Sequence, residues 1–200
     1  MLHILKGFFA LIALCITSCC FLGFVPSFIS KKAGLDGGLM GCLIGLGLLI
    51  YIFINNQSIE LVIALIVITF LLGLFLISPA EYIFYFIFGD KERYTGNNNQ
   101  KNNYYHTIID KVHGQLIAGL PIFFMNNDYR LAGTVFFIIS WFAFQDFYIS
   151  KPWLIKKIEN KYQGRRGHKG SFGIMIDATV AGILAAVLTS LYIIVFNFFV

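Results

Sequence analysis

Charged residues are scarce in this chain of 200 residues. Asp, Glu, Lys and Arg together make up 12% of it, whereas a soluble domain carries about 25%. Hydrophobic residues supply 58% of the sequence, and the mean hydropathy is +0.77. A surface with so few charges is unsuited to water. The composition therefore excludes a soluble globular protein and predicts an integral membrane protein.

Cysteine is sparse as well, and its placement argues against a zinc-type site. Four cysteines lie in apolar surroundings, and none stands at metal-ligand spacing from a histidine: Cys15, Cys19, Cys20 and Cys42. They are interpreted as small buried hydrophobic residues. The stretch ITSC, which ends at Cys19, resembles a bacterial lipoprotein cleavage site. Its apolar surroundings fit a spanning helix equally well, so both interpretations stay open.

No internal repeat is visible in the sequence, and this disfavours a transporter. A spanning helix needs about 20 residues, and most of the apolar segments approach that length. They cover residues 7–25, 37–54, 59–79, 112–125, 131–149 and 173–199. The predicted fold is an all-α, polytopic integral membrane helical bundle with five to six membrane segments. A single membrane domain, residues 1–200, contains them all.

Two of the segments have an ambiguous topology. Segment 112–125 is too short to cross a membrane unaided and contains Pro121, so it is predicted to be a re-entrant half-helix or a tilted helix. Segment 7–25 follows Lys6, and a simple alternation of segments would place that lysine outside the cell. A re-entrant or interfacial course for 7–25 removes the conflict.

Lys and Arg outnumber Asp and Glu by fifteen to ten, giving a net charge of +5. Thirteen of the fifteen basic residues fall within 26–36, 80–111 and 150–172. Because cytoplasmic loops of membrane proteins are enriched in Lys and Arg, 80–111 and 150–172 are predicted to be cytoplasmic loops. Basic loops beside a membrane favour an anionic lipid as partner over a nucleic acid.

The last apolar segment contains one acidic residue, Asp177, in the stretch GIMIDATVAG. A charge at membrane depth costs about 2.5–3.5 kcal/mol on insertion scales. Alternating segments would bring Asp177 to the cytoplasmic end together with Asp110, Asp146 and Lys151. Carboxylates beside a basic residue suit Mg²⁺ and a phosphate group. Capping and dipole effects at helix N-termini explain the same acids equally well.

Four stretches resemble, in order, the motifs of the bacterial phosphatidylglycerophosphate phosphatase A family. The similar stretches are AGLDGGL at 33–39, IIDKVHGQLIAGLP at 108–121, KPW at 151–153 and GSFGIMIDATVAG at 170–182. The resemblance runs over most of the chain. It implies a Mg²⁺-dependent enzyme of the bacterial inner (cytoplasmic) membrane, with a site that faces the cytoplasm.

The activity implied is removal of the terminal phosphate of phosphatidylglycerophosphate, a phospholipid substrate, to give phosphatidylglycerol. A metal would neutralise the phosphomonoester and polarise the attacking water. The resemblance implies Asp110, Asp177 and Lys151 as catalytic residues. Substrate contacts would come from Lys151, Gly34 and Gly37. The expected metal ligands are Asp110 and Asp177, with Asp146 added because it ends a neighbouring segment.

Seven positions depart from the family pattern. In the AGLDGGL stretch, Ala33, Leu35 and Gly38 stand in place of Pro, Thr and Ser. Lys111 stands in place of Glu, Gln145 of Arg, and both Tyr148 and Ala178 of Asp. Asp146 lies two residues before the expected aspartate, which is a rotation of about 200° on a helix. It is therefore predicted to face away from the position that Tyr148 occupies.

These departures leave two interpretations of the function. In one, the protein is a phosphatase with a rearranged site, in which His113, Asp146 or Asp36 substitutes as a ligand or base. In the other, it is a catalytically degenerate member that binds anionic lipid or serves in assembly. The sequence predicts no oligomeric state.

Overall fold

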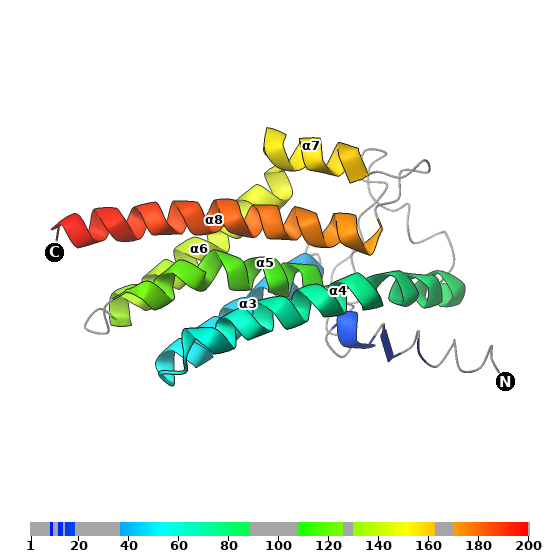
Figure 1. The fold of residues 1–200 in the computed structure, drawn as a ribbon, viewed down its shortest axis with the longest axis horizontal. Coiled ribbons are helices and arrows are strands. Elements are labelled where there is room, and N and C mark those ends of the chain that lie inside the picture. Colours follow the sequence, from blue (N-terminus) through cyan, green and yellow to red (C-terminus); the bar gives the residue numbers. More distant parts are fainter. Residues whose placement is uncertain are drawn as a thin grey trace.

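The structure is a computed structural model, and every regular element in its described part is a helix. The described residues are 9, 12–13, 15–18, 37–88, 108–125, 130–162 and 170–199. In chain order the helices are α3 (Gly37–Ile54), α4 (Ile59–Phe88), α5 (Ile109–Gly119), the 3₁₀ helix η3 (Leu120–Phe124), α6 (Arg130–Ser150), α7 (Trp153–Tyr162) and α8 (Ser171–Phe199) (Figure 1). The prediction of an all-α membrane bundle is confirmed.

Three of these helices are long and apolar enough to cross a membrane. The candidate spans are Ile59–Ala80, Ala132–Ser150 and Ser171–Phe199, and α3 contributes a shorter apolar stretch, Leu39–Ile54. Large apolar side chains on their outer faces are exposed, as lipid contact requires, among them Phe75 at 71% and Phe142 at 61%.

Segment boundaries agree closely with the sequence, with two differences. Helix α4 continues through Pro79 to Phe88, whereas a loop was expected from residue 80. Helix α7 likewise lies inside the expected loop 150–172. Most of segment 7–25 lies outside the described residues, and so does Cys19 of the ITSC stretch, so the predicted course of the segment and cleavage at Cys19 stay predictions.

The short helix α5 lies at the centre of the bundle and packs against α3, α4, α6 and α8 (Figure 1). All but one of its eleven residues are buried. Eleven residues span only about 16 Å, and η3 continues the segment with Pro121 in its first turn. A proline there removes no helical hydrogen bond. The sequence prediction of a short, interrupted helix thus takes the form of α5 followed by η3.

Glycines let α5 approach its neighbours at backbone distance. A Cβ added to Gly45 of α3 would lie 2.8 Å from Cβ of Gln115, and one added to Gly182 of α8 would lie 2.6 Å from the carbonyl oxygen of Gly114. Both distances are too short for real side chains. Small residues at helix contacts are the usual means by which membrane helices pack closely.

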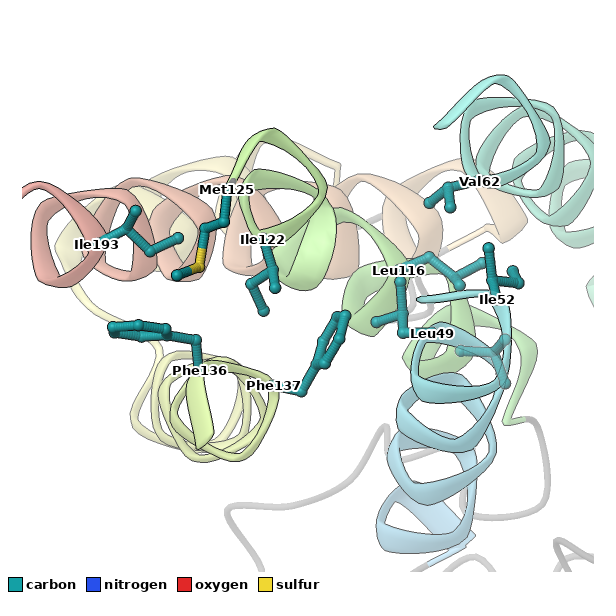
Figure 2. Packing of buried hydrophobic residues seen from close by; sticks show 10 residues of the cluster. Leu49, Ile52, Val62, Leu116, Ile122, Met125, Phe136, Phe137 and Ile193 are labelled. Carbon is teal, nitrogen blue, oxygen red and sulfur yellow. The ribbon is translucent and has the colours of Figure 1, made fainter. Parts of the chain in front are cut away.

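An apolar core joins α5 and η3 to the surrounding helices (Figure 2). Leu116 and Ile122 are fully buried there and belong to one cluster with Phe137 of α6. Phe53 of α3 meets Phe123 and Phe137 edge-on, with ring centroids 5.6 and 5.3 Å away. This core fixes the position of α5, whose N-terminal turn carries the polar residues described below.

Two residues with positive φ end helices at opposite ends of the bundle. Asn56 has φ 53° in the turn between α3 and α4, and Lys151 has φ 46° at the end of α6. Figure 1 shows the α3–α4 turn, the start of α6 and the C-terminus at one end. The starts of α5 and α8 lie at the other end. Helices α3, α4, α5, α6 and α8 therefore alternate in direction (Figure 1).

Candidate functional site

Asp110 stands in the first turn of α5 and has no exposed surface. Its Oδ2 atom lies 2.9 Å from Nζ of Lys111. The same oxygen accepts a hydrogen bond from the hydroxyl of Tyr148, which lies 3.0 Å away on α6. The helix dipole also favours a negative charge at this end of α5. The carboxylate is therefore neutralised from inside the bundle, and it ties α5 to α6.

Lys111 is buried as well, with 8% of its side chain exposed. Its ammonium lies 5.3 Å from the centroid of the Tyr148 ring, at a distance typical of a cation–π contact. Neighbouring residues on a helix point about 100° apart and seldom face each other. Helix α3 packs closely against Lys111 beside this cation–π contact. A Cβ added to Gly41 would lie 2.8 Å from Cβ of Lys111.

Asp177 belongs to the same polar cluster, although it comes from α8. It is 3% exposed, and Tyr148 lies within electrostatic range of both Asp177 and Asp110. Asp110, Lys111, Tyr148 and Asp177 are called the Asp110 cluster below. Helices α5, α6 and α8 each contribute to it, so the bundle brings together two of the acids that the sequence singled out.

Cys42 of α3 is a neighbour of this cluster that the sequence did not identify. It interacts electrostatically with Asp110 and Lys111 and hydrogen-bonds with Gln145 of α6. Cys42 is 1% exposed. In the sequence, the apolar surroundings of Cys42 indicated a packing residue. In the structure, its polar neighbours come from helices that are far away in the chain.

The remaining predicted site residues in the described part of the chain are Asp146, Lys151 and Gly37. Asp146 is exposed on α6, while Tyr148 reaches Asp110, in agreement with the rotation expected between positions 146 and 148. Lys151 is partly buried at the end of α6, where its amide donates to the carbonyl oxygen of Phe147 at 3.1 Å. Gly37 begins α3.

Gly34 and Asp36 are outside the described residues.

His113 is held by the helices on either side of α5. Its Nδ1 atom lies 3.1 Å from both Oγ1 of Thr69 and the carbonyl oxygen of Ile66 on α4. Its Nε2 atom lies 3.0 Å from Oγ1 of Thr179 on α8. Because both ring nitrogens have partners, His113 links α4, α5 and α8 as a buried structural histidine. Thr69 and Thr179 are polar residues in apolar helices. Their presence there is the sequence feature that could have indicated this role.

The residues of the Asp110 cluster do not fit a divalent metal ion. Among the described residues, no group of three His, Cys, Asp or Glu side chains could hold one. Oδ2 of Asp110 already faces an ammonium and a hydroxyl, and the ammonium would repel a second cation. Mg²⁺ requires a near-ideal octahedron of oxygen ligands. The arrangement offers instead a buried carboxylate pair with one internal ammonium.

Comparison with known proteins identifies the family. Residues 15–193 match the family model for phosphatidylglycerophosphatase A. No curated protein and no solved structure matches the chain. Since the family model covers most of the sequence, the chain belongs to the phosphatidylglycerophosphatase A family, and the resemblance seen in its motifs is confirmed.

Proposed function

We propose that this member of the phosphatidylglycerophosphatase A family hydrolyses the terminal phosphate of phosphatidylglycerophosphate and releases phosphatidylglycerol. The observation that carries the proposal is the family match over residues 15–193, with Asp110 and Asp177 buried in one cluster at one end of the bundle. The protein acts in the bacterial inner membrane, with this end facing the cytoplasm.

The reaction needs a base, a countercharge and an acid. Water attacks phosphorus, the bond from phosphorus to the glycerol oxygen breaks, and that oxygen takes up a proton. Asp110 or Asp177 accepts the proton of the attacking water, as a positioned carboxylate can, and the protonated carboxyl group then gives that proton to the leaving glycerol oxygen. Lys151 offsets the charge on the phosphate oxygens, and Gly34 and Gly37 contact the substrate. Each of these steps is assigned to residues of the chain itself, and none is routed through a magnesium ion.

Amphipathic α7 supports the placement at an anionic lipid surface. Ile155 is 1% exposed on the side of α7 that packs against α8. Trp153 is 73% exposed, and Nζ of Lys157 lies 5.9 Å from the centroid of its ring. Lys156 and Lys161 are exposed too. Tryptophan with lysines is typical of helices that lie at the headgroup level of anionic membranes, so an anionic phospholipid is the proposed partner of α7.

Phosphate release tests the proposed reaction directly. The full chain, purified in nanodiscs, is incubated with phosphatidylglycerophosphate, and inorganic phosphate is measured with and without a chelator. We expect release above the protein-free rate and its loss in Asp177→Asn. Glu60→Gln is the matched control, because Glu60 is exposed at the start of α4 and should keep full activity.

A folded protein that releases no phosphate would overturn the proposal. That outcome would point to the non-catalytic alternative, a family member that binds anionic lipid or serves in assembly.

A further inference from the structure

We propose that the ammonium of Lys111 is a built-in cation that takes the place of a divalent metal at Asp110. In this chain Asp110 is then not a metal ligand, and its cluster binds no Mg²⁺. The inference concerns which cation the carboxylate holds. It therefore stands apart from the question of whether the protein hydrolyses a phospholipid.

The first support is the contact geometry. Nζ of Lys111 lies 2.9 Å from Oδ2 of Asp110, a normal distance for a charge-assisted hydrogen bond. The Tyr148 hydroxyl donates to the same oxygen from 3.0 Å. A metal that used this oxygen would have to displace both donors, because Mg²⁺ binds its ligands at about 2.0–2.1 Å.

The second support is burial. Asp110 is fully buried and Lys111 is 6% exposed as a whole residue. Opposite charges attract most strongly where water is excluded, and a further cation beside the ammonium is repelled for the same reason. Gly41 packs close to the first carbon of the Lys111 side chain, so this turn of α5 is held against α3.

The third support is the ligand inventory around the pair. Asp177 shares the cluster, but no group of three His, Cys, Asp or Glu side chains in the described part of the chain could hold a metal. At the family's second acidic pair the residue after Asp177 is Ala178, which is fully buried and brings no oxygen ligand. Even with Lys111 moved away, two carboxylates would remain.

Binding of Mn²⁺, a spectroscopic substitute for Mg²⁺, tests the proposal without any activity assay. The full chain in zwitterionic nanodiscs is titrated with Mn²⁺, and the free ion is counted by electron paramagnetic resonance. We expect the natural protein and Asp110→Asn to bind the same amount. A saturable site in the natural protein that is lost in Asp110→Asn would overturn the proposal.

Charge reversal provides the second arm of the test. Lys111→Glu removes the ammonium and adds a carboxylate, so Mn²⁺ affinity should rise by more than about tenfold. Lys156→Glu makes the same change of charge on the exposed face of α7 and should bind no more Mn²⁺ than the natural protein. A folded Lys111→Glu variant that binds no more than Lys156→Glu would overturn the proposal. If Lys111→Glu does not fold, the comparison with Asp110→Asn still decides.

Discussion

Gly182 of α8 lies against Gly114 of α5 so closely that a Cβ on Gly182 would come within 2.6 Å of the Gly114 carbonyl oxygen. This backbone contact sets the crossing of the two helices that carry the buried acids. Gly114 is one helical turn after Asp110, and Gly182 follows Asp177 by five residues on α8. The distance between the two carboxylates therefore depends on a pair of residues that have no side chains.

Replacing Gly182 with alanine should destabilise the bundle. The added methyl group would clash with the Gly114 backbone, and overpacking of this kind costs about 1–3 kcal/mol. Thermal unfolding in detergent would show the loss. Gly47→Ala is the matched control, because a Cβ there meets nothing within 4 Å and alanine favours helix. Equal stabilities of the two variants would contradict the prediction.

The Asp110–Lys111 pair should be strongly coupled in stability. Lys111→Met leaves a buried carboxylate without its cation, and breaking a buried ion pair costs about 3–5 kcal/mol. The double variant Asp110→Asn/Lys111→Met removes both charges and should recover most of that loss. Denaturant titration of the four proteins gives the coupling energy. Additive effects would mean that the pair contributes nothing as a pair.

Loss of the Tyr148 hydroxyl should loosen the link between α5 and α6. Tyr148→Phe removes a hydrogen bond to a charged carboxylate, which is worth about 1.5–3 kcal/mol. Tyr51 is 66% exposed on α3, so Tyr51→Phe serves as the control and should change the unfolding free energy little. Should both changes have the same effect, the contact between Tyr148 and Asp110 would not be stabilising.

The roles of the Lys151 backbone and of its side chain can be tested separately. Its φ of 46° is a left-handed conformation that glycine adopts without steric cost. Lys151→Gly should therefore keep the unfolding temperature or raise it slightly. Phosphate release should fall by about tenfold or more if the ammonium offsets substrate charge, as proposed. Retained activity in the glycine variant would assign Lys151 to ending α6 rather than to chemistry.

The lysines of α7 should make its lipid contact selective for anionic headgroups. In a Trp141→Phe background, Trp153 is the remaining tryptophan of the chain, and its fluorescence can be quenched by brominated lipid in nanodiscs. Anionic brominated lipid should quench more than zwitterionic lipid. Changing Lys156, Lys157 and Lys161 to glutamine should abolish the difference, since each lysine is worth about 1 kcal/mol near an anionic surface. A preference that survives the triple change would argue against the assignment.

Much of the fold follows from local features of the sequence. Apolar segments of about 20 residues predict spanning helices because a shorter helix cannot cross the hydrocarbon layer. Residues 131–149 and 173–199 were placed within a few residues of α6 and α8 on this basis. The helical period also predicted that Asp146 and Tyr148 face different ways. The family motifs identified Asp110 and Asp177 as the acids of interest.

The contacts of those residues were decided by the tertiary structure. Adjacent positions on a helix do not ordinarily pair, so a contact between the ammonium of Lys111 and Asp110 could not be predicted from the sequence. That contact forms where Tyr148 packs in from α6. The hydrogen-bond partners of both His113 ring nitrogens lie on other helices. Local sequence sets the length of a helix and the faces it presents. The faces that meet are chosen by close packing between helices far apart in the chain, and here glycines allow α5 to be enclosed on every side.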